Sequence, residues 1–180
     1  MPGFDYSQRP SGLSVLYDSG YTVGTPAALD TGATIPPGHL DLMVFLYLRT
    51  NRAAPADNIN IIFNNDSAAH YDFQRLQGIT TTASASSGSA NIALGSYTVE
   101  SSTAAAGSFS AIQLLIPSYD NTVGWKAVLT MCVAPDPSQF AGQMIHGQWH
   151  STAAINRITV NPVVGTAFAA GSRMVVYGLQ

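Results

Sequence analysis

The chain has 180 residues, of which 46% are apolar and only 9% are charged, and its formal net charge is −3. This length fits one domain with a substantial core. An average soluble domain carries roughly 25% charged residues, so we expect other subunits to cover part of this surface and uncharged polar side chains to solvate the rest. The seven Lys and Arg residues are scattered, which argues against nucleic acid as a direct partner, because no basic cluster is present to neutralise phosphates.

The N-terminal segment and the single cysteine also limit the classes of protein. Residues 1–10 lack the apolar region of a secretory signal, and no stretch has the ~20 apolar residues of a membrane span. We therefore expect a protein made in a cytoplasm, with no membrane partner. Cys132 has no second cysteine to pair with and lies in an apolar run, which predicts a buried, unreactive thiol.

Apolar residues recur with a period of two, and Gly and Pro punctuate the chain, which predicts an all-β fold. We expect residues 1–12 to form an extended N-terminal arm and residues 13–180 to form one domain. About ten short antiparallel strands favour a single-domain β-sandwich or jelly roll. The clearest predicted strands, in chain order, are residues 13–18, 39–50, 59–63, 70–76, 109–116, 123–133, 144–150, 155–160 and 173–179. Residues 20–35 are expected to hold two short strands, and residues 78–110 short, weakly specified strands with long loops.

The strand predicted over residues 39–50 is apolar on both faces. Leucine and valine alternate along one face from Leu40 to Leu48, and Met43, Phe45 and Tyr47 lie on the other. This pattern is typical of a central strand covered on both sides, here by a second sheet and by a loop or a neighbouring subunit. Large aromatic residues are expected to anchor the core; these are Phe45, Phe63, Trp125, Trp149 and Tyr177.

Two histidines four residues apart, His146 and His150, are candidates for a metal pair. They fall on a strand pattern with Gln148 between them on the same face. At about 3.3 Å per residue they lie ~13 Å apart, too far to share one ion. We therefore expect no metal here and a polar face that is exposed or that contacts other subunits.

Ser67, His70 and Asp72 are the residue types of a nucleophilic triad. No G-x-S-x-G turn accompanies them, and a triad is defined by geometry rather than by composition. A turn followed by a paired strand is the favoured interpretation of this segment. We expect no catalytic residue, no cofactor and no enzymatic activity.

Carboxylates are scarce, and Asp57, Asp66 and Asp72 form their only local cluster. With Asn64 and Asn65 they could offer oxygen ligands to calcium, although no EF-hand spacing is present. Capping of turns by these side chains is the default interpretation. Several tyrosines in or beside predicted loops fit either a sugar-stacking platform or a protein interface; they are Tyr6, Tyr17, Tyr21, Tyr97 and Tyr119.

Three motifs carry a family resemblance. They are F-N-x-D…Y across Phe63–Tyr71, W-x-S-T-A-A-I across Trp149–Ile155, and F-x-x-G-S…Y-G from Phe168 to Gly178. The stretch Ile35–Arg52 also fits, and the likeness extends over about residues 29–179. On these motifs the chain resembles a family of phage and prophage virion structural proteins. The resemblance implies a component of the virion, assembled in the bacterial host cytoplasm, and it supplies no catalytic residues.

The expected function is that of a capsid decoration protein that stabilises the head shell. The expected partners are copies of the chain, as a trimer or another cyclic homo-oligomer, together with the major capsid protein or other virion proteins. The alternative is a tail-tip or fibre module that binds host surface glycan. The residues expected at interfaces are Phe4, Tyr6, Arg9, His146, Gln148 and His150.

Overall fold

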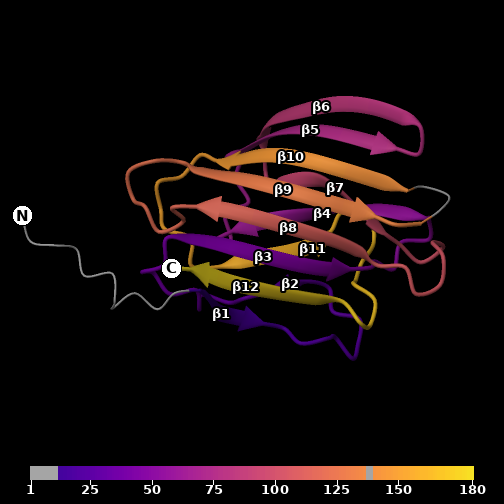
Figure 1. Cartoon of the computed structure of the whole chain (residues 1–180), viewed down its shortest axis with the longest axis horizontal. Coiled ribbons are helices and arrows are strands. Elements are labelled where there is room, and N and C mark those ends of the chain that lie inside the picture. Colours follow the sequence, from indigo (N-terminus) through magenta and orange to yellow (C-terminus); the bar gives the residue numbers. More distant parts are fainter. Residues whose placement is uncertain (1–11, 137–139) are drawn as a thin grey trace, which may run out of the picture.

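The protein is seen in a computed structural model that describes residues 12–136 and 140–180. The expected all-β fold is confirmed: the described residues form twelve strands and no helix (Figure 1). The N-terminal arm expected over residues 1–12, with Phe4, Tyr6 and Arg9, lies outside the described residues except for Gly12. The strands are β1 Leu13–Asp18, β2 Leu29–Asp30, β3 Asp41–Leu48, β4 Ala56–Phe63, β5 Tyr71–Ile79, β6 Thr82–Asn91, β7 Leu94–Glu100, β8 Ser110–Pro117, β9 Lys126–Ala134, β10 Ala141–Trp149, β11 Ile158–Pro162 and β12 Arg173–Leu179.

The strands form two sheets that pack face to face as a β-sandwich. The large sheet has the order β1-β12-β3-β8-β9-β10-β5-β6, and the small sheet has the order β2-β11-β4-β7. Every strand pairing within the two sheets is antiparallel. The large sheet faces the viewer in Figure 1, with the small sheet behind it. Among residues 12–136 and 140–180, the small sheet therefore covers one face of the large sheet, and no layer covers the other, called here the outer face.

Alternation along the strands builds one core between the sheets. On β3, Leu42, Val44, Leu46 and Leu48 point inward and are fully or almost fully buried. The inward residues of β4, among them Ile61, meet them from the small sheet in the same buried cluster. Burying each such side chain contributes roughly 1.5–3 kcal/mol, which fixes the strand register because a slip by one residue would turn every one of them outward.

The expected core anchors divide into two groups. Phe63 and Trp149 are buried, as predicted, with ring centroids 5.7 Å apart. Phe45 is 40% exposed and Trp125 is 60% exposed, so the expectation that they anchor the core is wrong. Tyr177 is partly exposed and meets Phe45 edge-on, at 5.9 Å between ring centroids, outside the core. These three aromatic residues lie on the outer face of the large sheet.

The burial pattern of strand β9 explains why Trp125 does not lie in the core. Its inward residues are Lys126, Val128, Thr130, Cys132 and Ala134, and the more apolar alternate set points outward. The buried ammonium of Lys126 is accommodated because it donates hydrogen bonds to two backbone carbonyls of the preceding loop, at 2.6 Å and 3.0 Å. A buried cation is tolerated when its donors are satisfied in this way.

The expectation of weakly specified strands between residues 78 and 110 is wrong in one respect. Strand β6 runs for ten residues and pairs with β5 as a long hairpin at the edge of the large sheet, with one register shift between Tyr71 and Phe73. The predicted turn after β4 is present, and Asn64 and Asn65 have positive φ values of 52° and 58°. Asparagine tolerates this left-handed conformation better than most residues.

Candidate interaction surface

The outer face of the large sheet is apolar across its central strands. The register places Phe45 of β3 beside Val175 of β12 on one side and Gln113 of β8 on the other. Gln113 pairs in turn with Met131 of β9, and Met131 pairs with Met144 of β10. One continuous row of mostly apolar side chains therefore crosses five strands.

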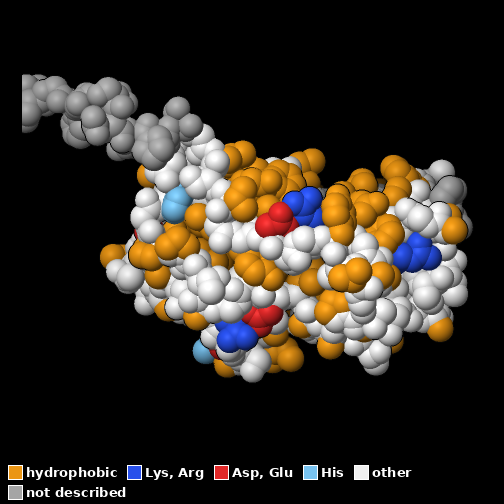
Figure 2. Space-filling view, turned by 90° about the horizontal axis from the view of Figure 1, so that it is seen from below, with side chains coloured by type: hydrophobic (Ala, Val, Ile, Leu, Met, Phe, Trp, Pro, Cys, Tyr) orange, Lys and Arg blue, Asp and Glu red, His pale blue; other side chains and the backbone are white. Residues whose placement is uncertain are grey.

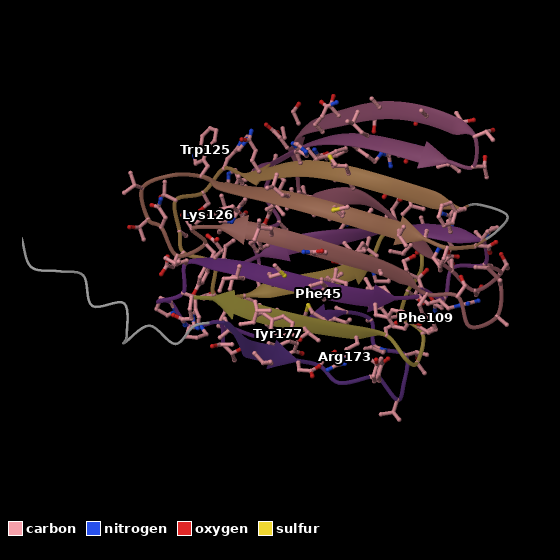
Figure 3. All side chains as sticks on the ribbon, in the orientation of Figure 1. Phe45, Phe109, Trp125, Lys126, Arg173 and Tyr177 are labelled. Atoms are coloured by element: carbon pink, nitrogen blue, oxygen red, sulfur yellow. The ribbon has the colours of Figure 1, made fainter. Side chains whose placement is uncertain are left out.

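Two flanking rows extend this apolar surface. Tyr177, Met43, Leu115 and Leu129 lie in register on one side of the central row. On the other side, Tyr47 stacks on the ring of Phe109 with 4.7 Å between centroids, followed by Ala111 and Val133. We call the three rows together the apolar face. Figure 3 shows Phe45 and Tyr177 side by side over β3 and β12, and Phe109 at the far end of the same strands.

A groove of about 630 Å³ runs along the apolar face. Its walls include Phe45, Tyr47, Tyr177 and Met131, and Gly142 is among the small residues that line it. Large side chains beside small ones make the face uneven. Side chains of a second sheet can interdigitate with a surface of this shape.

The size of the exposed apolar area distinguishes it from an ordinary monomer surface. Met131 is 63% exposed, and Phe45, Tyr47 and Leu129 are each 40–45% exposed. With neighbouring Val133, Met144, Leu76 and Val15, the exposed parts amount to roughly 700 Å², taking large side chains as ~150–250 Å² each. A contiguous patch above a few hundred Å² marks an interaction site.

Two Arg–Asp ion pairs lie beside the apolar face or the small sheet, and each is formed between side chains of this chain. Arg173 binds Asp18 of β1 through two donors at the edge of the apolar face, and its guanidinium lies 5.0 Å from the ring centroid of Tyr21. Arg157 binds Asp30 in the same bidentate way beside the small sheet. Seen from the β1 edge, hydrophobic and uncharged polar side chains make up most of the surface, and charged groups are few and scattered (Figure 2).

The remaining cations described by the structure also donate within the chain. Arg49 donates to four backbone carbonyls of residues 102–108, at 2.8–3.3 Å. Arg52 donates to a backbone carbonyl of β4, and Arg75 donates to the Ser86 hydroxyl. These cations stabilise loops and the edge hairpin.

The predicted polar residues of β10 lie on the outer face beyond the apolar rows. His146 is exposed, Gln148 is half-buried, and both alternate with the buried Trp149 side of the strand, as predicted. Gln148 donates from Nε2 to Oδ2 of Asp72 at 3.1 Å. The His150 ring stacks on the indole of Trp125 with 4.3 Å between centroids, and its Nε2 lies 3.1 Å from Asp72.

The residues of the candidate triad are not assembled as one. Nδ1 of His70 lies 2.8 Å from Oδ2 of Asp66, whereas Asp72 contacts His150 and Gln148. Burial raises the pKa of Asp66, but hydrogen bonds from His70 and Trp149 outweigh it and hold that pKa below its usual value. Asp66 therefore serves as a structural acceptor in the turn after β4.

The candidate calcium cluster is dispersed. Asp57 accepts hydrogen bonds from the backbone N–H groups of Asn58, Val164 and Gly165. Among residues 12–136 and 140–180, no group of three or more His, Cys, Asp or Glu side chains converges as metal ligands would. The capping interpretation fits Asp57 and Asp66, because each accepts backbone N–H groups of a loop.

Comparison with known proteins gives no relative. No protein-family model matches the chain, and neither does any curated protein or any solved structure. In the described part of the chain, no helix is long and apolar enough to cross a membrane.

The outward orientation of four side chains at β9 was not predicted from the sequence; they are Trp125, Leu129, Met131 and Val133. The signal was present, because β9 alternates apolar residues on one face with Val128, Cys132 and Ala134 on the other. A strand that is apolar on both faces is the same signal that β3 gave, and it predicts a covering layer on the outer side.

Proposed function

We propose that the chain is a non-enzymatic structural subunit of a bacteriophage particle, a capsid decoration protein that is assembled onto the virion in the host cytoplasm. The resemblance of three sequence motifs to virion structural proteins supports this role. A low content of charge and a large uncovered sheet face also support it, because both are features of surfaces that function in contact with other subunits.

The observation that carries the proposal is the apolar face, and its proposed occupant is a second copy of this chain. Together with its neighbours Leu76 and Val15, the face offers roughly 700 Å² per copy, close to the ~800 Å² per partner of a standard stable interface. Its side chains are uncharged from Val175 to Met144, so two like faces meet without charge repulsion.

Symmetry limits the ways in which copies of the chain can cover the apolar face. In an isologous two-fold contact the same surface of both subunits forms the interface. Such a contact covers the apolar face of every copy. Stacked sheets pack about 10 Å apart with their strands about 30° from parallel. Of the expected trimer or other cyclic homo-oligomer, this proposal favours a two-fold dimer, or a larger closed assembly that contains such a two-fold contact.

The second proposed partner is the shell itself. Residues 1–10 include Phe4, Tyr6 and Arg9, two aromatic side chains and one cation in a segment that precedes edge strand β1. Aromatic side chains and arginine are residue types that are common at protein interfaces. We assign contact with the major capsid protein to this segment.

The experiment compares particles assembled with and without the protein. Under heat or osmotic stress, shells that lack it should release their nucleic acid at a lower temperature or a milder shock. Particle images should place its density on the outside of the head. Equal resistance of the two kinds of shell, or density on the tail, would overturn the decoration role.

A second candidate is a tail-tip or fibre module that binds host surface glycan. The specific observation that favours it is the exposed indole of Trp125 with Asp72, Gln148 and His150 beside it. Density on the tail in the same images, together with loss of adsorption when the protein is removed, supports this candidate over the first.

A further inference from the structure

An exposed tryptophan marks the end of the large sheet where β9 begins and β10 ends. One face of the Trp125 ring stacks on His150, with 24° between the planes, while 60% of the residue is exposed to solvent. Figure 3 shows Trp125 at this end, away from Phe45 and Tyr177 of the apolar face. An indole of this exposure that is held flat by a second ring is a prepared stacking surface rather than a core side chain.

The residues around this indole are polar, unlike those of the apolar face. Asp72 accepts hydrogen bonds from the backbone N–H of Ala90 at 2.8 Å and from Gln148 at 3.1 Å, and its side chain is still 28% exposed. A carboxylate has about four acceptor sites, so these two donors orient Asp72 without filling it. His150 lies between Trp125 and Asp72: its ring stacks on the indole, and its buried Nε2 lies 3.1 Å from the carboxylate without a hydrogen-bond partner.

An exposed indole beside a carboxylate and an amide is suited to binding a sugar. The apolar face of a pyranose ring stacks on an aromatic ring, and its hydroxyl groups donate to a carboxylate and exchange hydrogen bonds with an amide. Small-molecule sites combine apolar and aromatic side chains with a small number of placed polar groups, and the surface around Trp125 offers both kinds. We propose that Trp125, Asp72, Gln148 and His150 form a binding site for a neutral saccharide.

The charge at the site excludes acidic sugars. Asp72 would repel the carboxylate of a sialic or uronic acid. The nearest cation along the chain, Lys126, points into the core and donates its ammonium hydrogens to the carbonyls of Asn121 and Gly124. In Figure 3 the labels of Trp125 and Lys126 lie at the same end of β9, and the burial pattern places their side chains on opposite faces. Uncharged hexoses and N-acetylhexosamines are therefore the expected ligands.

This inference does not depend on the shell role, because Trp125 lies outside the apolar face. A decoration protein with such a site would hold the particle on glycan-bearing surfaces, and a tail module would use it for adsorption. Loss of self-association and loss of sugar binding are separate outcomes, measured on different variants.

The experiment titrates the full chain with tetrasaccharides of β-1,4-linked glucose, N-acetylglucosamine, mannose and galactose, and with a sialylated oligosaccharide. Tryptophan fluorescence is the readout. Because Trp149 is only 2% exposed, a saturable change reports on Trp125. We expect at least one neutral tetrasaccharide to bind in the millimolar range or tighter, and the sialylated probe not to bind. Absence of binding by every neutral probe, or preference for the sialylated one, would overturn the site.

Four variants test which residues bind the sugar. Affinity is measured by isothermal calorimetry for Trp125→Ala, because this variant lacks the indole whose fluorescence reports binding. Trp125→Ala should weaken binding at least ~10-fold, a loss of about 1.4 kcal/mol. Asp72→Asn and Gln148→Ala should each weaken it several-fold. Phe140→Ala removes an exposed aromatic residue at the other end of β10 and should leave binding unchanged. Equal affinity of Trp125→Ala and the parent chain, with both folded by circular dichroism, would contradict the assignment.

Discussion

The indole N–H of Trp149, at the end of β10, donates a 2.7 Å hydrogen bond to Oδ2 of Asp66, in the turn after β4. The same carboxylate accepts the backbone N–H of Ala68 and contacts Nδ1 of His70. One side chain therefore connects a turn that leaves the small sheet to the last residue of a large-sheet strand.

We predict that Asp66→Ala lowers the free energy of unfolding by about 1–3 kcal/mol, because the Trp149 indole loses its acceptor in a half-buried site. Urea denaturation followed by circular dichroism measures the change. Ser89→Ala, at an exposed position of β6, is the control and should change stability by less than ~0.5 kcal/mol. An equal effect of the two substitutions would show that the Asp66 contact does not stabilise the fold.

The Asp18–Arg173 pair predicts a pH dependence. A hydrogen bond from Arg173 lowers the pKa of Asp18 to about 2, against ~3.9 for an unfolded aspartate. Because the unfolded chain takes up this proton first, the pair stabilises the fold above about pH 4, and that contribution is lost as the pH falls toward about 2. Asp18→Asn should reduce the urea midpoint at neutral pH and have little effect near pH 2. A difference that does not vary with pH would contradict the prediction.

Two glycines of β10 provide a matched pair of substitutions. A Cβ on Gly147 would lie 2.6 Å from Cδ2 of Leu94, which is fully buried beneath it. A Cβ on Gly142 meets nothing within 4 Å. Gly147→Ala should therefore destabilise the protein by about 1–3 kcal/mol through overpacking, whereas Gly142→Ala should be neutral or slightly stabilising. The reverse order of thermal midpoints would contradict this packing of β10 on β7.

The thiol of Cys132 is predicted to be inert in the folded protein. It is 5% exposed, its Sγ–H donates to the backbone carbonyl of Thr98 at 3.2 Å, and burial raises its pKa to about 12. The thiolate is the reactive form, so a thiol reagent at pH 8 should label it only after unfolding. Labelling of the native protein at the rate of a free cysteine would show that the β9 core opens readily.

Much of this architecture follows from the sequence. The two-sided apolar pattern of β3 predicts both its central position and the need for cover on its outer side, and the structure places β3 between β12 and β8. The alternation of His146, Gln148 and Trp149 predicts their faces correctly. These predictions work because alternation is a local property of a strand.

Features that depend on which groups meet in the folded chain, and not on the polarity pattern of a single strand, do not follow from it. In β9, the set that contains Trp125, Leu129 and Met131 is the more apolar, yet Lys126 faces inward, because carbonyls of its own preceding loop satisfy its ammonium. The β5–β6 hairpin was not predicted, because β6 has few large side chains and is held by main-chain pairing at the sheet edge. The sugar site likewise needs Trp125 and Asp72, more than fifty positions apart in sequence, to lie on the two sides of β10.

The central claim is that the apolar face binds a second copy of the chain. Its most direct test is sedimentation velocity of the full chain at micromolar concentration, compared with the double variant Phe45→Ser, Met131→Gln. A matched control is Val163→Ser, Val164→Gln, which changes similarly exposed residues in the loop after β11. We predict a closed oligomer of 18.9 kDa subunits for the parent and the control, and a folded monomer for the double variant. A monomeric parent chain, or an assembly that the double variant leaves intact, would contradict the claim.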